Sequence, residues 1–450
     1  MGKYFGTDGF RGHANTTLNS KHAFLIGSYF GQAAVKFSGY DKAKIVIGKD
    51  TRISGDMFVN ALSAGIVSTG ASAYILGTIP TPGVAYITNK FNFNFGIMIS
   101  ASHNPYYDNG IKVLNMHGEK LTDKVIGLCE DYIDAGIDNV VLAKDEHIGT
   151  CCSFNSAHKS YIDHIKNAVK NKFNGVNIAL DCANGAASGF AYELFNSLGA
   201  NVSIINDKPN GININVDCGS THLKCLSEYV KSKNFDIGFA FDGDADRCLA
   251  VDSNGSEISG DQLMFICARR LKQENRLKNN TLVTTVMSNF GLYKALDKFD
   301  ISYEKTNVGD RFVYENMIEN NHKLGGEQSG HIIFSDYATT GDGMLTAVLV
   351  VDSLIELNED ISQASSKMRV YPQVLKNITV DDKQTSLKDS RVLDSISKVE
   401  KALDDNGRIL VRPSGTEPLI RIMVEAGDVD TCHKMVDSVI NSFDLSGHIV

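Results

Sequence analysis

Short apolar runs alternate with helical patterns along the chain up to about Met368. Three of these runs open a repeated unit, in which an apolar strand leads into a turn containing Gly, Ser or Asn and then into a helical pattern. The opening strands are predicted at residues 44–50, 176–182 and 281–287. Such short continuous apolar runs are typical of buried parallel strands. The pattern therefore predicts three α/β units.

Each unit contains a second apolar strand that ends in an unusually polar loop. These second strands are predicted at residues 95–99, 237–241 and 322–324. Ligands of open α/β sheets bind beyond the carboxyl ends of the strands, so loops in equivalent positions of three packed units are expected to converge on one cleft.

The last part of the chain has a different order of elements. The pattern predicts a strand at 374–380, a helix at 387–403, a strand pair around 413–418 and a helix at 430–443. This order suits a small α+β domain. The predicted fold is three similar α/β domains with mixed sheets plus a smaller C-terminal α+β domain, around a central cleft. The domains are placed at residues 1–153, 154–254, 255–367 and 368–450.

Composition and charge narrow the class of protein. With 450 residues, of which 43% are hydrophobic, the chain can bury a sizeable core. Its 53 acidic and 44 basic residues give a net charge of -9, which argues against a general nucleic-acid surface. The N-terminus lacks an apolar signal segment and no apolar run is long enough to span a bilayer, so we expect a cytoplasmic protein without a membrane partner.

The nine cysteines have no regular spacing. We therefore expect reduced thiols and no zinc site, and we expect the adjacent Cys151 and Cys152 to be packing residues.

The loop after the predicted strand at 95–99 contains Ser102. Asn104-Pro105 and the turn at 108–110 keep this loop irregular, so we expect the Ser102 hydroxyl to be exposed. A turn or capping serine is the reading that the loop alone favours. A serine hydrolase is disfavoured, because Gly-x-Ser-x-Gly is absent and His103, as the next residue, is expected to point away from Ser102.

Three aspartates alternate after the predicted strand at 237–241, namely Asp242, Asp244 and Asp246. On an extended loop their carboxylates can gather round one hard cation such as magnesium. The spacing does not fit an EF-hand, but a solvated acidic turn stays open as an alternative. A cation here would neutralise charge on a phosphoryl group while the adjacent Arg247 donates hydrogen bonds.

The segment from Arg412 to Pro418 has the features of an anion site. Its Ser-Gly-Thr core exposes backbone N–H groups and hydroxyls, which can form an anion nest. Arg412 and Arg421 flank it, and a guanidinium fork matches phosphate oxygens in geometry and charge. A plain hairpin loop with two surface arginines is the alternative.

Three further segments give weaker signals. In the loop at 325–331, glycines allow close approach of the backbone to a ligand, Glu327 and Ser329 can bind sugar hydroxyls, and His331 is a packed histidine or a proton carrier. Arg11 and Lys112 are candidate partners of a phosphate. A Walker loop is absent from the sequence, which argues against a sugar kinase.

Together these loops resemble the α-D-phosphohexomutase superfamily along nearly the whole chain. The matching segments follow the order of that superfamily: Phe5 to Gly12, Ser100 to Pro105, Asp242 to Arg247, Gly326 to His331 and Arg412 to Pro418. Gln328 and the segment from Val308 to Phe312 resemble the glucosamine branch. Phe10 and Ala245 depart from the usual residues without removing a functional group.

The resemblance implies that Ser102 carries a phosphoryl group and that one Mg²⁺ per chain is bound by this phosphoserine with Asp242, Asp244 and Asp246. It implies that Glu327 and Ser329 hold sugar hydroxyls. The groups implied around the transfer are Arg11, His103, Lys112, Arg247 and His331. Those implied for the distal phosphate of the substrate are Arg412, Ser414, Gly415, Thr416 and Arg421.

The implied reaction interconverts glucosamine 6-phosphate and glucosamine 1-phosphate through a phosphoserine and a bisphosphate intermediate, on the route to UDP-N-acetylglucosamine and the cell wall. A phosphosugar is the expected partner, a sugar 1,6-bisphosphate the expected activator and a homodimer the expected assembly. A mannose or glucose phosphomutase, a phosphatase-like enzyme with Asp242 as the nucleophile and a non-catalytic sugar-phosphate binder are the alternatives.

Overall fold

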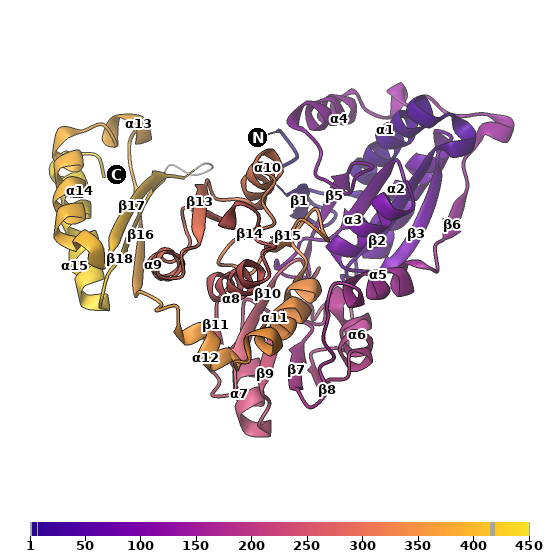
Figure 1. Cartoon of the computed structure of the whole chain (residues 1–450). Helices are drawn as coiled ribbons and strands as arrows, with labels where there is room; N and C mark the ends of the chain where they lie inside the picture. The colour runs from indigo at the N-terminus through magenta and orange to yellow at the C-terminus, as the bar shows by residue number, and fades with distance from the viewer. Residues whose placement is uncertain (1, 7, 415–418, 450) are drawn as a thin grey trace. The chain divides into compact units, whose positions relative to one another are not determined.

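The computed structural model describes residues 2–6, 8–414 and 419–449. Contacts within the chain divide it into two units, one comprising residues 1–287 and 301–366 and the other comprising residues 288–300 and 367–450. The first unit contains three mixed sheets, and the second contains one antiparallel sheet (Figure 1). The prediction of three α/β domains with mixed sheets plus a smaller C-terminal α+β domain is confirmed.

The first domain has a six-stranded sheet with the order β1-β5-β4-β2-β3-β6. Its strands are β1 (Phe10–His13), β2 (Lys44–Lys49), β3 (Ser72–Thr78), β4 (Phe95–Ile99), β5 (Asp108–Leu114) and β6 (Cys151–Ser153). Its α-helices are α1 (Ser20–Ser38), α2 (Gly55–Ser68), α3 (Thr81–Lys90) and α4 (Asp123–Ala135). The central strand β4 is buried along its whole length, which explains its continuous apolar sequence.

The second domain has a five-stranded sheet with the order β11-β10-β9-β7-β8. Its strands are β7 (Asn177–Asp181), β8 (Asn201–Ile205), β9 (Ile237–Phe241), β10 (Cys248–Asp252) and β11 (Glu257–Ile258). Its α-helices are α5 (Ala157–Lys166), α6 (Ala191–Ser197) and α7 (Lys224–Lys233). Strand β9 is parallel to β7 and antiparallel to β10, so its carboxyl end turns back in a tight loop.

The third domain has a four-stranded sheet with the order β13-β12-β14-β15. Its strands are β12 (Thr281–Thr285), β13 (Ser302–Thr306), β14 (Leu324–Gly326) and β15 (Ile332–Phe334). Its α-helices are α8 (Gly260–Gln273), α10 (Asp310–Asn320), α11 (Gly343–Leu357) and α12 (Ile361–Ser366). Helix α8 begins at a capping box, in which the side chains of Ser259 and Gln262 each accept the backbone N–H of the other.

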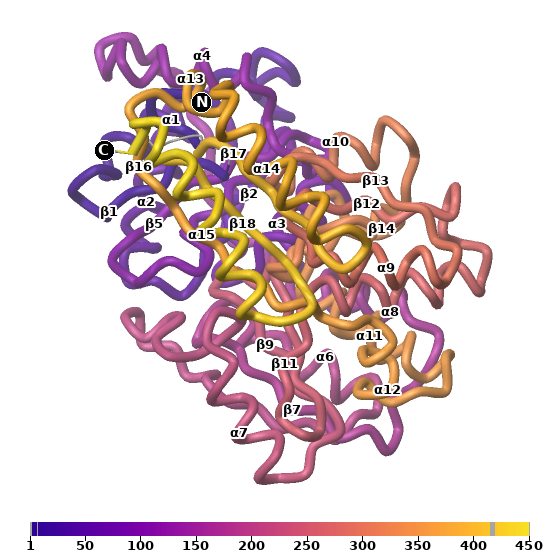
Figure 2. The backbone as a smooth tube through the Cα atoms, turned by 90° about the vertical axis from the view of Figure 1, so that its left-hand side faces the viewer, coloured from indigo at the N-terminus to yellow at the C-terminus, as the bar shows by residue number. Residues whose placement is uncertain are grey.

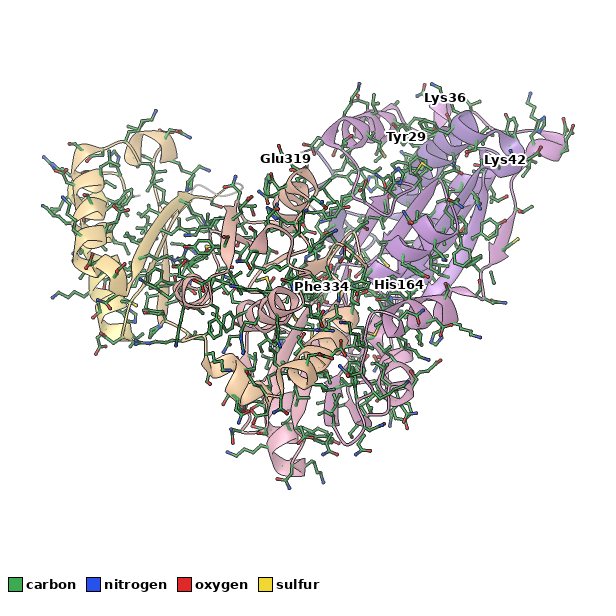
Figure 3. All side chains as sticks on the ribbon, viewed as in Figure 1. Tyr29, Lys36, Lys42, His164, Glu319 and Phe334 are labelled. Carbon is green, nitrogen blue, oxygen red and sulfur yellow. The ribbon has the colours of Figure 1, made fainter. Side chains whose placement is uncertain are left out.

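Polar contacts join the second and third domains within the first unit. The Tyr161 hydroxyl donates to Asp342 at 2.8 Å, and His164 Nε2 lies 2.9 Å from the carbonyl oxygen of Tyr337. Figure 3 labels His164 and Phe334 in this region. These bonds join α5 to the loop between β15 and α11, and so help to fix the positions of the loops described below.

The C-terminal domain has a three-stranded antiparallel sheet with the order β16-β18-β17. Its strands are β16 (Gln373–Thr379), β17 (Arg408–Pro413) and β18 (Leu419–Glu425), and its α-helices are α13 (Lys383–Ser386), α14 (Ser390–Leu403) and α15 (Val429–Leu445). Helices α14 and α15 cover one face of the sheet (Figure 1), and Figure 2 shows them in front of it. Apolar side chains such as Ile422, Val436 and Phe443 form the core between these layers.

Helix α9 (Phe290–Lys298) follows β12 in the sequence but belongs to the second unit. The buried Glu425 carboxylate accepts hydrogen bonds from Phe290 N at 3.0 Å and from Asn289 Nδ2 at 3.1 Å. It also pairs with Arg408 at 2.5 Å. The chain therefore crosses between the two units three times, after residues 287, 300 and 366.

All nine cysteines are free thiols, as predicted. The prediction that Cys151 and Cys152 are packing residues is wrong, because both are exposed on the short edge strand β6. Among the described residues, no helix combines the length and the apolarity needed to cross a bilayer.

Candidate active site

The three predicted loops of the first unit lie together at the carboxyl ends of their strands. Ser102 follows β4, Asp242 directly follows β9, and Glu327 directly follows β14. Ser102 Oγ donates a hydrogen bond to Asp242 Oδ2 at 2.5 Å, which joins the first loop to the second. Burial opposes the charge of Arg247, but neighbouring carboxylates, among them Asp246 and Glu327, outweigh burial and raise the pKa of Arg247. Cys248 N, which follows the aspartate loop, donates to the carbonyl oxygen of Gly330 at 3.0 Å, so the three loops meet as expected.

Ser102 is buried, with 1% of its surface exposed, so the prediction of an exposed hydroxyl is wrong. The hydroxyl is covered because the aspartate loop of the second domain packs onto it, and the sequence of the first loop cannot reveal that contact. His103 also differs from expectation, since its Nδ1 lies 3.2 Å from Ser102 Oγ. Burial, with Arg247 and Arg11 nearby, lowers the pKa of His103 to about 4, so the ring is neutral at pH 7.

The three aspartates form a buried cluster that fits one hard cation. Asp242, Asp244 and Asp246 each offer a carboxylate oxygen, and these oxygens lie within 4.8 Å of one another. One oxygen of Asp244 and one of Asp246 are buried and have no hydrogen-bond partner among the described residues. A buried carboxylate oxygen without a donor is costly, and such oxygens are the ligands that Mg²⁺ prefers. The cluster therefore has the donor set and the unmet demand for positive charge of a divalent metal site.

Charge within the cluster is uneven. Burial and the two neighbouring carboxylates raise the pKa of Asp242 well above its usual value. Burial also works against ionisation of Asp244, but the Lys112 ammonium, 2.9 Å away, outweighs burial and holds the pKa of Asp244 below its usual range. Thr81 Oγ1 donates to the same Asp244 oxygen at 2.5 Å. Lys112 thus supplies positive charge directly beside the cluster.

A chain of alternating charges continues from Lys112 into the third domain. Asp8 Oδ2 lies 3.3 Å from Lys112 Nζ, and Asp8 Oδ1 lies 3.0 Å from Lys120 Nζ. Lys120 pairs with Asp310 at 2.6 Å, and Asp310 Oδ2 lies 3.5 Å from His331 Nε2. Burial opposes the charge of Lys120, but Asp310 and Asp8 outweigh burial and raise its pKa. The network brings His331 and Lys112 into one electrostatic environment across two domains.

The glycine-rich loop at 325–331 presents several polar atoms. Glu327 Oε1 accepts a hydrogen bond from Gly309 N at 3.1 Å, which orients this carboxylate. Gln328 Oε1, Ser329 Oγ and His331 Nδ1 are buried without a partner among the described residues. Arg11 forms an ion pair with Asp8, three residues earlier in the chain. These unmatched donors and acceptors suit a polyhydroxylated ligand.

The residues predicted to form an anion site belong to the C-terminal domain. Arg412 on β17 faces Arg421 on β18 as a direct cross-strand pair. Burial and the charge of Arg421 lower the pKa of Arg412, so an anion beside the pair would relieve their repulsion. Lys383 Nζ donates to the carbonyl oxygen of the buried Ser414 at 2.7 Å. The predicted substrate residues Gly415 and Thr416 lie outside the described residues.

Comparison with known proteins agrees with this arrangement. The chain matches the family models of phosphoglucomutase/phosphomannomutase for α/β/α domain I at residues 2–139, domain II at 159–255, domain III at 259–371 and the C-terminal domain at 375–442. It is 49% identical over 450 residues to the phosphoglucosamine mutase of Lachnoclostridium phytofermentans, covering 100% of both chains. It is 48% identical to that of Oceanobacillus iheyensis, covering 98% of both. The chain belongs to the phosphoglucosamine mutase family of the phosphohexomutase superfamily.

Solved structures support the same fold for this phosphohexomutase. A phosphoglucomutase/phosphomannomutase family protein of Burkholderia thailandensis matches with a TM-score of 0.80 at 22% identity, over 99% of this chain and 98% of the other. The N-acetylphosphoglucosamine mutase of Aspergillus fumigatus, in complex with GlcNAc-6P and magnesium, matches with a TM-score of 0.72 at 16% identity, over 99% and 96%.

Four residues around the phosphohexomutase serine loop escaped the sequence reasoning. Thr81 donates a hydrogen bond to Asp244. Three further residues form hydrogen bonds with the serine loop, namely Asp50, Arg52 and Asn215. The sequence contained a signal for Asp50 and Arg52. Both lie in the polar run after β2, at the carboxyl end of a buried strand, where the other site loops also lie. Asn215 carried no such signal, because it lies in a long irregular segment of another domain.

Proposed function

We propose that this chain is a phosphoglucosamine mutase that interconverts glucosamine 6-phosphate and glucosamine 1-phosphate with Ser102 as the phosphoryl carrier. The observation that carries the proposal is the 2.5 Å hydrogen bond between Ser102 Oγ and Asp242 Oδ2, which joins a serine nucleophile to a carboxylate cluster. The relatives at 48–49% identity over the full length bear that enzyme's name. Their agreement supports the amino sugar as substrate.

We propose that the aspartate cluster, together with a phosphorylated Ser102, holds one Mg²⁺. When bound, Mg²⁺ withdraws charge from the phosphoryl oxygens and so favours attack at phosphorus. The buried oxygens of Asp244 and Asp246 without hydrogen-bond partners support this assignment. A phosphoserine bears roughly -1.5 to -2 charges at neutral pH, and Lys112 and Arg247, which interact with the charges of the aspartates, would offset the charge gathered here.

The proposed cycle has two transfers of the same kind. In the first, the 1-hydroxyl oxygen of glucosamine 6-phosphate attacks phosphorus, the bond from Ser102 Oγ to phosphorus breaks, and the hydroxyl proton leaves to a base. The resulting 1,6-bisphosphate turns over, Ser102 Oγ loses its proton and attacks the 6-phosphorus, the bond from that phosphorus to the sugar O6 breaks, and O6 takes up a proton. Such transfers need mainly positioning and charge neutralisation. A sugar 1,6-bisphosphate is expected to prime Ser102 by running the second transfer.

We propose that residues of the loop at 325–331 bind the sugar and that the arginines of the C-terminal domain bind the phosphate that does not react. Buried Gln328 Oε1, Ser329 Oγ and His331 Nδ1 have unmet hydrogen-bonding capacity that supports the first part. The repulsive Arg412–Arg421 pair supports the second. Each assignment is a proposal that rests on local chemistry.

Substrate profiling tests the proposed function. Purified protein with Mg²⁺ and catalytic glucose 1,6-bisphosphate is given glucosamine, N-acetylglucosamine, glucose or mannose 6-phosphate, and 1-phosphate formation is followed by ³¹P NMR. We expect the highest kcat/KM with glucosamine 6-phosphate. A higher kcat/KM with the glucose or mannose substrate would contradict the assignment, and no turnover of any sugar would favour a silent binder.

A further inference from the structure

The backbone on either side of the Ser102 side chain is held by two side chains from different domains. Arg52 Nη2 donates to the carbonyl oxygen of Ser102 at 2.8 Å and to that of Asn104 at 2.9 Å. Asn215 Nδ2 donates to the same two carbonyl oxygens, at 2.9 and 3.2 Å. Arg52 belongs to the first domain and Asn215 to the second. The loop is therefore gripped twice at the same two points, and we call this arrangement the carbonyl clamp.

Arg52 is fixed as firmly as the loop that it holds. Its side chain is fully buried, and its Nε donates to Asp50 Oδ2 at 2.8 Å. Its Nη1 also donates to the carbonyl oxygens of Pro105 and, at 3.1 Å, of Asp108. A planar guanidinium can serve several acceptors at once because its donors diverge in one rigid fork. One buried side chain thus bonds four carbonyls of the loop.

The opposite side of the Ser102 backbone is held through Asp50. Ser102 N–H donates to Ser100 Oγ at 2.9 Å, and Ser100 Oγ donates to Asp50 Oδ2 at 2.7 Å. Ser102 itself has φ = 51°, in the left-handed region that residues other than glycine rarely adopt. Such a conformation persists only where the surroundings determine it, and here both peptide groups of Ser102 are bonded.

The aspartate loop packs directly on the clamp. A Cβ atom on Gly243, which lies between the first two aspartates, would stand 2.6 Å from the Ser102 carbonyl oxygen and 2.9 Å from Asn215 Nδ2. Only glycine allows this close approach. The position of the Ser102 carbonyl and the position of the aspartate loop are therefore linked by direct contact.

We propose that Arg52 and Asn215 are positioning residues that keep Ser102 Oγ in register with the aspartate cluster during both phosphoryl transfers. The inference rests on the proposed function of Ser102. In the cycle, Ser102 Oγ is first the leaving group and later the nucleophile, so it must occupy one place in both transfers. Displacement by about 1 Å costs on the order of 100-fold in rate. Among the described residues, the side-chain hydrogen bonds of Arg52 and Asn215 reach Asp50 and the serine loop and not the loop at 325–331, so loss of the clamp should leave sugar binding intact.

The test compares two asparagines of one segment. In Asn215→Asp the carbonyls of Ser102 and Asn104 lose their hydrogen bonds from Asn215 Nδ2, and in Asn215→Gly the same bonds are lost while glycine accepts the left-handed φ of 60° at this position. The matched control is Asn213→Asp, because Asn213 Nδ2 donates to a carbonyl of its own segment, that of Lys208, at 3.0 Å. Arg52→Lys keeps the charge and loses the fork.

The measurements are kcat, KM, the thermal midpoint and the rate at which glucose 1,6-bisphosphate phosphorylates Ser102, followed by intact mass. We expect both Asn215 variants and Arg52→Lys to lose about 10- to 100-fold in kcat and in the phosphorylation rate, with KM within about threefold of wild type. The control should resemble wild type in all four.

Three outcomes overturn the proposal. Wild-type kcat and phosphorylation rate in the folded Asn215 variants would remove the clamp from catalysis while leaving Ser102 as the carrier. A loss of thermal midpoint with an equal loss in the Asn213→Asp control would make the segment merely structural. If wild-type protein is not phosphorylated at Ser102 at all, the proposed function fails first and the clamp with it.

Discussion

The Lys112 ammonium and the aspartate cluster set the chemistry of the site at the scale of single residues. Lys112 Nζ lies 2.9 Å from Asp244 and 3.4 Å from Asp246, and it is buried. One buried cation cannot balance three carboxylates, and the unmatched charge is what a divalent ion would neutralise. A divalent ion in the proposed site would share this task with Arg247, which interacts with the charges of Asp246 and Asp242.

Asp244→Asn tests this balance. The amide removes one negative charge and leaves Lys112 with a weaker partner, so we expect the Mg²⁺ concentration for half-maximal activity to rise at least tenfold, or turnover to be lost. Mg²⁺ titration of the activity measures the effect. Asp236→Asn, an exposed aspartate of the same domain, is the control. Full activity of Asp244→Asn in metal-free buffer would contradict the metal assignment.

Sequence reasoning could predict which residue types meet at the site but not how they are covered. Ser102 and the three aspartates stand next to buried strands, where the rule for ligand sites of α/β sheets directs attention. The burial of Ser102 and the contact of His103 with it depend on another domain packing against the loop. A single sequence does not show which surfaces of two domains pack together. Asn215 was missed for the same reason.

At the scale of elements, the start of helix α11 is expected to make the stability of the fold depend on pH. Asp342 caps this helix by accepting Leu345 N–H at 2.9 Å, and it accepts the Tyr161 hydroxyl from α5. Burial raises the pKa of Asp342 to about 6, although these hydrogen bonds act to lower it. The folded protein therefore binds this proton more tightly than the unfolded chain does between about pH 4 and pH 6.

Asp342→Asn should change the response of stability to pH. Because the raised pKa favours folding only while the carboxyl is protonated, this contribution is lost as pH rises through the folded pKa. Asparagine keeps the cap but cannot ionise, so the variant should gain about 2 kcal/mol over wild type between pH 4.5 and pH 7.5. Thermal midpoints at the two pH values measure the change.

The control for that experiment is Asp131→Asn, an exposed aspartate on α4. It should shift equally from wild type at both pH values. An Asp342→Asn variant that differs from wild type by the same amount at pH 4.5 and pH 7.5 would contradict the raised pKa.

The apolar pattern predicted the positions of the strands closely, but it did not predict which unit each helix belongs to. The strands predicted at 95–99 and 237–241 coincide with β4 and β9, because strands buried on both faces have continuous apolar sequences. Helix α9 reads like any helix after a strand, and its assignment to the second unit depends on bonds such as that from Phe290 N to Glu425. These partners are 135 residues apart in the chain.

The division into two units changes the expected motion at the scale of the whole molecule. The domain boundary predicted between residues 367 and 368 would give the C-terminal domain one connection to the rest of the chain, whereas the chain crosses between the units at three places and α9 belongs to the second unit. In the proposed cycle a bisphosphate reverses its ends without leaving the protein, and a step of this kind commonly involves movement of one part of a protein relative to another. Any such hinge has to involve residues near 287, 300 and 366. The predicted domain boundaries and the homodimer stay predictions.

Arg421→Ala tests whether the C-terminal domain holds the phosphate that does not react. Loss of a charged hydrogen bond is expected to weaken phosphosugar binding by roughly 1.5 to 3 kcal/mol and to increase release of free bisphosphate. Titration calorimetry and rapid-quench analysis of bisphosphate measure the two effects. Arg391→Ala on α14, an exposed arginine of the same domain, is the control. Unchanged affinity together with unchanged release would remove Arg421 from the proposed site.

Transfer of label from the phosphoenzyme tests the central claim most directly. Protein labelled with ³²P by a sugar 1,6-bisphosphate is freed of excess reagent, the label is mapped to its peptide, and glucosamine 6-phosphate is added in a single turnover with Mg²⁺. The account predicts label on Ser102 that passes to glucosamine 1,6-bisphosphate and glucosamine 1-phosphate at a rate no slower than kcat, and no labelling of Ser102→Ala. Label on an aspartate, or normal turnover by Ser102→Ala, would contradict the account.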